Sequence, residues 1–337
     1  MSCKDNHTFF WSAEFLHTAY HITAMFTIPM AVLLFYCILY ETPKRMESMK
    51  PALLNLQIWV TNMDIFMTVF CCPYVFFPSA SGFSLGLLSN YVGIKWQAYY
   101  YQLSTAYLGV ALIKLYENRQ SQIATITWKF TNRRNRRIYY TFNYIVLSLI
   151  FLPFYMTNTN QDELREWVLQ RIPCPTIEFF DYDTYFVLRG DETLPFYSVS
   201  GCILIIVSQT GFFLIHALLH ITVLKNHQLS KATKAMQKKY LACVSIQFSL
   251  PILALMFPSI YILYSDKSNY YNQAYNNFTF IVISIHGLVS SLSALYIYKP
   301  YRDFCVQKIL RRKIHRVSVV NSVAKFGFLP VRDLSVL

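Results

Sequence analysis

Long apolar runs alternate with short polar segments along the chain, and the run from Tyr99 to Arg119 shows the pattern most clearly. Its side chains are apolar or aromatic, with polar interruptions at Gln102, at a Ser-Thr pair and at Lys114. About twenty such residues are enough for a helix to cross the roughly 30 Å of hydrocarbon in a bilayer. The run ends in Glu117-Asn118-Arg119, and five further Lys or Arg residues follow before the next apolar run. This pattern predicts a membrane-spanning helix with a strongly basic exit.

Seven runs of this kind occur, and 55% of all residues are hydrophobic while only 14% are charged, which is too apolar for an ordinary soluble domain. We therefore predict an all-α fold, a polytopic membrane protein whose residues 1–304 form a single seven-helix bundle. No internal repeat of the kind seen in many transporters is apparent. The predicted spans are residues 16–40, 51–77, 96–116, 138–157, 195–224, 240–264 and 278–298.

Lys and Arg residues are distributed unevenly between the segments that connect these runs. The first, third and fifth connections and the final segment carry 3, 6, 5 and 9 of them, whereas the first segment and the other connections carry 1, 1, 3 and 1. Because cationic residues of short loops stay on the cytoplasmic side, this predicts an amino terminus outside and a carboxyl terminus inside. Membrane topology thus explains the net charge of +13, and we expect no nucleic-acid partner.

Of the Asp, Glu, Lys and Arg residues, Asp64 and Lys114 lie within the predicted spans. Asp64 lies fourteen residues after Lys50, on the order of 20 Å along the helix, so its carboxylate must face the bundle interior. Two roles stay open for it: a structural hydrogen-bond hub with Asn55 or Ser290, or a site for sodium binding or activation. Span 6 contains two prolines seven residues apart, Pro251 and Pro258, which fall on nearly the same helix face and predict a kink.

The segments expected outside carry two modification signals. Asn6-His7-Thr8 is a glycosylation sequon near the amino terminus, where no cleavable signal peptide is recognisable. Cys3 and Cys174 are the cysteines in predicted extracellular segments. In an oxidising compartment they are expected to pair, which would tie the amino terminus to the long acidic loop of residues 158–194; the alternative is that either thiol stays free.

Aromatic residues are frequent where the spans reach the outside. A pocket between helices lined by apolar and aromatic groups suits a small, mostly apolar ligand, although Tyr and Trp also form an anchoring belt at a membrane interface. Span 3 places three positions on one stripe that would face such a pocket. His286, near the middle of span 7, serves either packing or ligand contact. The predicted ligand-binding residues are Tyr74, Tyr101, Gln102, Thr105, Leu108, Tyr261 and His286.

The basic tail, residues 305–337, follows a segment with amphipathic character. Between Tyr301 and Arg316 much of the apolar set falls on one helical face, which predicts a short helix on the inner leaflet. Cys305 beside it is a candidate for palmitoylation.

Several short motifs occur in a characteristic order: Glu117-Asn118-Arg119, Gln237-Lys238-Lys239-Tyr240 before Pro251, His286-Gly287, and Lys299-Pro300-Tyr301-Arg302. Together with Cys3, Ala13-Glu14-Phe15, Trp59 to Asp64 and Pro73-Tyr74, they resemble the nematode chemoreceptors called serpentine receptors class H over nearly the whole chain. Class I of the same superfamily is the nearest alternative. The chain lacks the Asp-Arg-Tyr and Asn-Pro-x-x-Tyr motifs of rhodopsin-like receptors, so details of their activation carry over only in outline.

This resemblance implies a G-protein-coupled receptor in the plasma membrane of chemosensory neurons, in their sensory cilia. Its partners would be a small chemical cue, a heterotrimeric G protein and the lipid bilayer. In this interpretation Arg119 is restrained between helix ends in the resting state and meets the G protein when the ends separate; the alternative is a solvated helix end. The residues assigned to switching and coupling are Glu117, Asn118, Arg119, Lys238, Lys239, Tyr301 and Arg302.

Catalytic signals are weak in this sequence. The eight cysteines are scattered, and we find no Cys/His group at metal-ligand spacing, no Gly-rich phosphate loop and no Gly-x-Ser-x-Gly motif. We therefore expect no enzyme, no metal and no cofactor. The remaining alternatives are a seven-helix ligand-gated channel, whose amino terminus would be inside, and a small-molecule transporter, which would show repeats or more buried ionisable residues.

Overall fold

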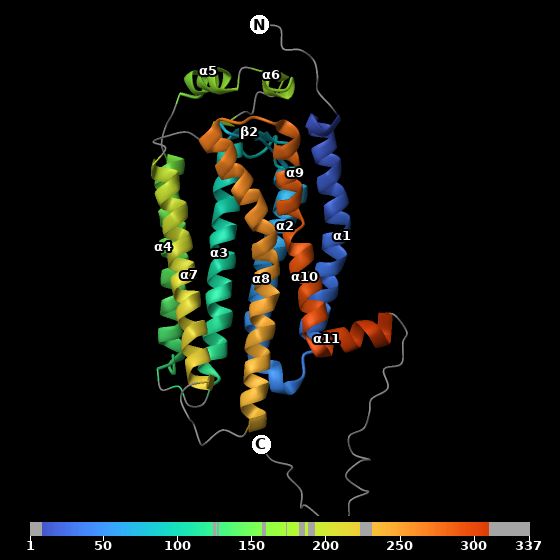
Figure 1. Cartoon of the computed structure of the whole chain (residues 1–337), viewed down its shortest axis with the longest axis vertical. Helices are drawn as coiled ribbons and strands as arrows, with labels where there is room; N and C mark the ends of the chain where they lie inside the picture. Colours follow the sequence, from blue (N-terminus) through green and yellow to red (C-terminus); the bar gives the residue numbers. More distant parts are fainter. Residues whose placement is uncertain are drawn as a thin grey trace, which may run out of the picture.

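The computed structural model describes residues 9–123, 126, 128–156, 160–172, 174–181, 186–187, 193–222 and 231–309. Long helices run side by side along the longest axis and form one bundle (Figure 1). The all-α prediction is confirmed. The bundle consists of α1 (Ala13–Tyr40), α2 (Lys50–Ile65) with its π-helical continuation η3 (Phe66–Cys71), α3 (Ile94–Ser121), α4 (Arg133–Met156), α7 (Thr193–Thr222), α8 (Lys231–Ser268), and α9 (Gln273–Ser284) followed by α10 (His286–Ile297).

Hydropathy and length alone qualify four of the described helical segments as membrane spans: Ala13–Tyr40, Met46–Cys71, Tyr197–Ile221 and Gln273–Ile297. The helices α3 and α4 are more polar. Helix α3 contains four charged residues, and α4 begins with four basic residues in its first five. Many apolar side chains on α1, α4 and α7 are exposed, as expected for faces that meet lipid.

Helix α3 packs against α2, α4 and α7 at the centre of the bundle. Small side chains allow this: a Cβ added at Gly109 would lie 2.2 Å from Ile206 Cδ1 of α7. Val110, Ala111 and Ile113 of α3 have no exposed surface. The bundle core therefore forms around α3, the helix that the sequence pattern marked most clearly.

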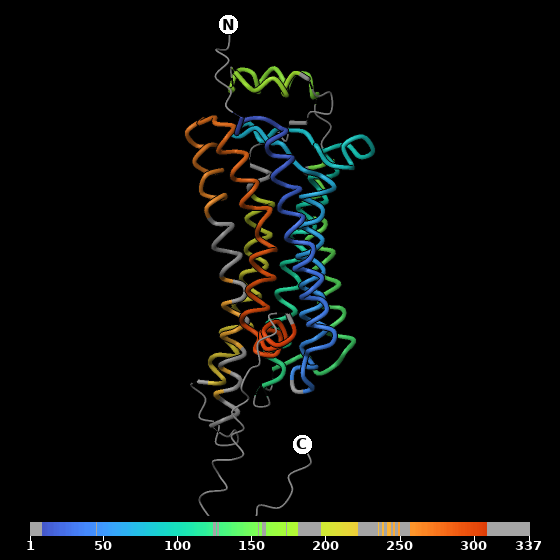
Figure 2. Tube along the Cα trace, turned by 90° about the vertical axis from the view of Figure 1, so that its right-hand side faces the viewer, coloured from blue at the N-terminus to red at the C-terminus, as the bar shows by residue number. Residues whose placement is uncertain are grey.

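The two ends of the bundle differ in character. One end, here called the cap, is covered by η1 (Phe9–Trp11), α5 (Gln161–Arg171), α6 (Glu178–Asp181) and a three-stranded antiparallel sheet of β1 (Pro73–Phe76), β2 (Ser81–Ser84) and β3 (Phe186–Val187). The other, here called the basic end, carries η2 (Lys44–Met49), the connection from α3 to α4, and α11 (Lys299–Phe304) with η4 (Cys305–Ile309). In both views α11 and η4 lie across the bundle axis (Figures 1 and 2).

Span 2 was predicted to continue to Phe77, and this boundary is wrong. The helix ends at Cys71, because Cys72 adopts a left-handed conformation (φ 46°, ψ 64°) and Pro73 follows. Residues before proline disfavour the helical region, so Pro73 also blocks helix continuation. Strand β1 then pairs with β2 in the register Tyr74 to Phe83 and Phe76 to Ser81.

The long segment between spans 4 and 5 is not simply an extended loop, because it contains α5, α6 and β3. The side chain of Asn160 caps α5 by accepting a hydrogen bond from the Asp162 backbone N–H, and two acidic residues occupy the first turn. Val168 of α5 and Ile172, directly after α5, pack into a second hydrophobic core with Tyr74, Phe76, Phe83 and Phe179. The cap is thus a small folded unit with its own core.

Spans 6 and 7 also differ from their predicted limits. Helix α8 begins at Lys231, so Lys238 and Lys239 are helical rather than in a loop. The last span starts at Gln273 and is divided, since α9 ends at Ser284 and α10 begins at His286. The predicted amphipathic segment is helical over Lys299–Ile309, and its remaining residues lie outside the described part of the chain.

Candidate functional site

A buried contact between a carboxyl and an imidazole group joins spans 2 and 7 near the middle of the bundle. Asp64 Oδ1 of α2 lies 3.2 Å from His286 Nδ1 of α10, and the side chains are 2% and 4% exposed. The same imidazole nitrogen lies 3.0 Å from the Ile283 carbonyl oxygen of α9. His286 therefore links the carboxylate of one span to the point where the other span is divided.

Gly287 makes this contact geometrically feasible. A Cβ at this position would lie 1.7 Å from Asp64 Oδ2 and 2.4 Å from Asp64 Cγ. The carboxylate thus occupies the space that any larger residue would fill, and His286-Gly287 works as a unit: one residue is the partner and the next provides room. The predicted partners Asn55 and Ser290 are not those found in this structure. Asn55 lies nine residues before Asp64, about 13 Å along the helix, too far for a side-chain contact.

A second buried network holds the basic end of α3 against α4. Glu117 is 1% exposed, and its Oε1 accepts a hydrogen bond of 3.0 Å from Arg136 Nη2. Its Oε2 accepts one of 2.7 Å from the Tyr140 hydroxyl. Lys114 Nζ lies 5.8 Å from the centre of the Tyr140 ring. A buried carboxylate is costly unless it is paired, so these contacts fix the α3–α4 junction.

Arg119 faces the opposite side of α3. Residues two apart on a helix are separated by about 200°, so Glu117 and Arg119 reach different neighbours. The Arg119 side chain is buried and interacts electrostatically with the phenols of Tyr298 and Tyr301, at the end of span 7 and in α11. The motif Glu117-Asn118-Arg119 therefore connects α3 to α4 on one side and to the α10–α11 junction on the other.

Tyr301 anchors α11 to the bundle. It has no exposed surface, and its hydroxyl lies 2.8 Å from the Thr42 hydroxyl, which in turn donates to the Ile38 carbonyl. Burial raises the pKa of the Tyr301 phenol to about 12, while the Thr42 hydrogen bond and the charge of Arg119 oppose this shift. Tyr301 is thus a neutral packing residue that holds the α11 segment across the bundle.

The other residues assigned to coupling are more accessible. Asn118 Nδ2 donates to the Ser48 carbonyl in the turn before α2. Arg302 donates to the Tyr296 carbonyl and lies over the Tyr296 ring. Lys238 is exposed near the start of α8, and the side chain of Lys239 lies outside the described residues. The first turns of α8 project beyond α3 at the basic end (Figure 1).

The predicted ligand-binding residues do not all meet. On α3, Tyr101 packs against the cap core, Gln102 and Leu108 are half-buried, and Thr105 is exposed and hydrogen-bonds to the Tyr101 carbonyl. The Tyr261 hydroxyl is bonded to Asn276 Oδ1 of α9, 2.8 Å away.

Tyr74 is placed differently from the prediction, in strand β1 of the cap rather than at the end of span 2. Its ring stacks on Phe83, and its hydroxyl donates to the Trp11 carbonyl at 2.5 Å and lies 3.2 Å from the Thr176 hydroxyl. With no exposed surface, Tyr74 supports the cap core instead of facing an open pocket.

The cap is fastened to several spans. Glu178 Oε1 of α6 accepts a hydrogen bond from the Ala13 N–H at the start of α1, and Arg171 of α5 pairs with Asp266 of α8 at 3.2 Å. Cys174, between α5 and α6, is disulfide-bonded. Cys3 and Asn6 lie outside the described residues, so the pairing of Cys3 with Cys174 and glycosylation at Asn6 stay predictions.

Residues 11–311 match the family described as serpentine type seven-transmembrane GPCR chemoreceptor Srh. The chain belongs to this family. It is also 27% identical over 327 residues to serpentine receptor class H-72 of Caenorhabditis elegans, an alignment that covers 96% of this chain and 94% of that protein. The resemblance inferred from the motifs is confirmed, and the protein is a membrane-embedded receptor of the chemoreceptor class, not of a class known for enzymes.

The described part of this receptor contains no group of three or more His, Cys, Asp or Glu side chains that could hold a metal ion. Two features of the site were missed by sequence reasoning: the Asp64–His286 pair and the Glu117–Arg136 pair. Helix geometry alone places Glu117 and Arg119 on different faces, but the partner of Glu117 depends on how α4 packs.

Proposed function

We propose that this receptor binds a small chemical cue in the cap half of the bundle and activates a heterotrimeric G protein at the basic end. The observation that carries the proposal is the position of Glu117-Asn118-Arg119. This motif lies at the basic end of the central helix α3, where Glu117 is bonded to α4 on one side and Arg119 interacts electrostatically with Tyr298 and Tyr301 on the other. Because α3 runs from the cap to this end, one rigid element joins the two sites (Figure 1).

In this proposal the basic end is cytoplasmic and the cap is extracellular. The Lys and Arg distribution supports this orientation, since the connections rich in these residues all belong to the basic end. A disulfide at Cys174 also suits an extracellular cap. The receptor would reside in the plasma membrane, in the sensory cilia of chemosensory neurons.

The cue would contact the cap half of α3 and its neighbours. The Oε1 atom of Gln102 is buried and has no hydrogen-bond partner among the described residues, so it is available to a ligand. Tyr101, one residue earlier, lies near enough to Asp64 to interact with it electrostatically. A ligand bound at Tyr101 and Gln102 would therefore change the surroundings of Asp64, and with them the Asp64–His286 contact between spans 2 and 7.

Transmission would use movement of α8 relative to α3. The two prolines of α8, Pro251 and Pro258, make it the helix best able to bend. A ligand that binds better to the arrangement with α8 displaced shifts the population toward it, by no more than its differential affinity. Arg119 and the exposed Lys238 would then be presented to the G protein together.

The proposal is tested by expressing the receptor in cells and recording calcium or cAMP responses to volatile and water-soluble odorants. An epitope added at the amino terminus and stained on intact cells reports orientation and surface density in the same experiment. A response that depends on the receptor and on a G protein supports the proposal. A cue-dependent current that persists when G proteins are inactivated would instead indicate a channel.

A further inference from the structure

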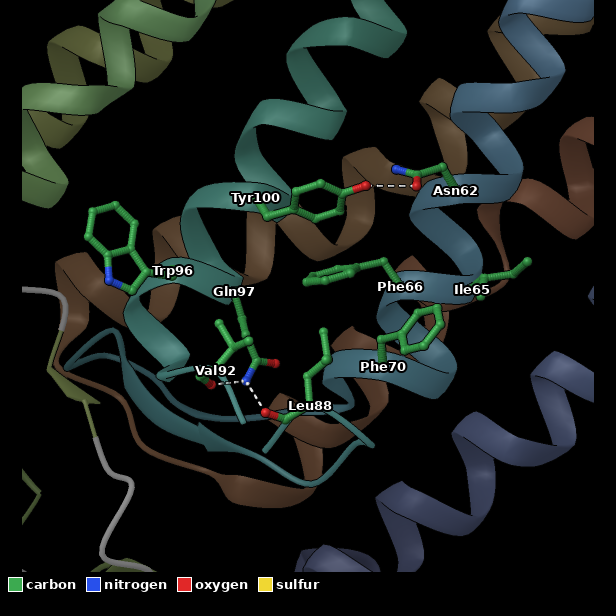
Figure 3. A pocket seen from close by; sticks show the side chains of 9 residues that line it. All are labelled: Asn62, Ile65, Phe66, Phe70, Leu88, Val92, Trp96, Gln97 and Tyr100. Carbon is green, nitrogen blue, oxygen red and sulfur yellow. Dashed lines mark hydrogen bonds between the residues drawn. The ribbon is translucent and has the colours of Figure 1, made fainter. Parts of the chain in front are cut away.

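A cavity of about 600 Å³ lies between spans 2 and 3 in the cap half of the bundle. Figure 3 shows its walls: Asn62, Phe66 and Phe70 come from α2 and η3, and Trp96 and Tyr100 come from α3. The volume lies within the range of small-molecule sites, and the lining is mainly aromatic and aliphatic with few polar groups. None of the predicted ligand-binding residues lines this cavity.

The cavity opens sideways, away from the bundle interior. Phe70, Trp96 and Tyr100 are 40%, 46% and 38% exposed. Asn62 and Phe70 lie 12 and 20 residues after Lys50, roughly 18 and 30 Å along the span, so the opening faces the cap-side half of the hydrocarbon layer. A molecule that enters must come through the membrane.

A loop, residues 85–93, closes the cavity toward the headgroups. Its Leu88 N–H donates to the Phe70 carbonyl at 2.9 Å, which joins the loop to η3. Gln97 of α3 holds the other side, because its Nε2 donates to the carbonyls of Leu88 and Val92 at 3.3 and 2.7 Å. Gln97 is 1% exposed, and its Oε1 accepts a hydrogen bond from the Ser84 hydroxyl. The loop therefore separates the cavity from the headgroup region, and the open side of the cavity faces the hydrocarbon.

One polar pair is set into the apolar wall. The Tyr100 hydroxyl donates to Asn62 Oδ1 at 2.8 Å (Figure 3). Asn62 Nδ2 donates in turn to the Ser104 hydroxyl at 3.1 Å. These bonds use the Tyr100 O–H and one of the two N–H groups of Asn62, and they leave lone pairs on the Tyr100 oxygen and on Asn62 Oδ1. The wall therefore offers two acceptors and one N–H donor, which suits a ligand hydroxyl group, because a hydroxyl can both donate and accept a hydrogen bond.

We propose that this cavity is a binding site for small lipophilic alcohols that reach the receptor through the bilayer. The inference rests on the proposed receptor function and adds a second site, separate from the one proposed at Tyr101 and Gln102, with its own ligand class and entry route. The alkyl part would lie against Phe66, Phe70 and Trp96, and the hydroxyl would donate to the Tyr100 oxygen. An occupant at this position lies between η3 and α3, whose next residue, Tyr101, is close to Asp64.

Photolabelling of the full receptor in lipid nanodiscs tests the site without any G protein. The probes are a small aliphatic alcohol bearing a diazirine, the matching diazirine alkane, and a phosphatidylcholine with a diazirine in its acyl chain. We expect the alcohol probe to label the segments 62–70 and 88–100, and an excess of the unmodified alcohol to displace it. Loss of a hydrogen bond is worth about 1 kcal/mol, so Tyr100→Phe should weaken alcohol binding about five-fold while alkane labelling is unchanged.

Cavity-filling variants make the test decisive. Val92→Trp, in the 85–93 loop, should abolish the labelling that the unmodified alcohol displaces. If Val92→Trp does not fold, Phe70→Trp fills the cavity from the opposite wall. Val207→Trp is the matched control, because Val207 is 62% exposed on α7. The inference is overturned if folded filled variants label like the wild type, or if the phosphatidylcholine probe labels the segments equally and free alcohol displaces neither probe. Because no signalling is measured, failure here leaves the coupling proposal intact.

Discussion

Among the described glycines, Gly287 is the one at which an added Cβ would make the closest contact, so Gly287→Ala should destabilise the receptor. The new Cβ would lie 1.7 Å from Asp64 Oδ2, whereas an ordinary carbon–oxygen contact is about 3.3 Å. The carboxylate would have to move by more than an ångström, and its 3.2 Å contact with His286 would be lost. Forcing an extra methyl group into a tightly packed core typically costs about 1 to 3 kcal/mol, a large part of the stability of most proteins.

The effect can be measured by thermal unfolding of the purified receptor with a thiol-reactive fluorophore, since Cys37, Cys71, Cys72 and Cys202 are free and buried. Gly211→Ala is the matched control, because a Cβ there would meet nothing within 4 Å. It should leave the melting temperature unchanged or slightly raised, given that alanine favours a helix by about 1 kcal/mol over glycine.

A double mutant shows whether the loss of stability comes from this contact or from any substitution at this position of span 7. Asp64→Ala removes the carboxylate that blocks the new methyl group, so adding Gly287→Ala to it should cost less than about 1 kcal/mol. Equal melting temperatures of Gly287→Ala and Gly211→Ala in the otherwise wild-type receptor would refute the reasoning.

Three further predictions concern the cap half. Asn6→Gln should remove a glycan, so that a glycosidase changes the gel mobility of the wild type alone; equal mobility of both would count against an external amino terminus. Cys3 and Cys174 should appear as one cross-linked peptide in mass spectrometry without reduction, and finding both thiols alkylatable would end that pairing. Tyr101→Ala and Gln102→Ala should each lower ligand potency at unchanged surface density, and unaltered potency in both would remove this face of α3 from the ligand site.

The bundle could be predicted because its signals are local. Each span is a continuous apolar run, and the Lys and Arg residues between the runs follow the rule that basic loops stay on the cytoplasmic side. The error at span 2 arose because Val75-Phe76-Phe77 prolongs the apolar run, and a short apolar segment does not distinguish a strand from a helix. Pro73 and Pro78 were the signals that could have corrected it.

The candidate site was harder to predict because its contacts join residues far apart in the chain. Asp64 and His286 were both singled out from the sequence, but their pairing depends on the relative rotation and height of two helices separated by more than 200 residues. Glu117 likewise needed Arg136 and Tyr140 from α4. A sequence pattern identifies such residues because burying a charged side chain in a bilayer costs free energy, but it does not determine their partners.

The central claim is that Arg119 transmits the signal at the basic end, and the most direct test compares Arg119→Ala with Arg137→Ala. Arg137 is exposed at the same end, so its removal changes the charge equally without touching the α3 network. At equal surface density, Arg119→Ala should bind the cue with wild-type affinity and produce no G-protein response, while Arg137→Ala should respond normally. A normal response from Arg119→Ala would contradict the account.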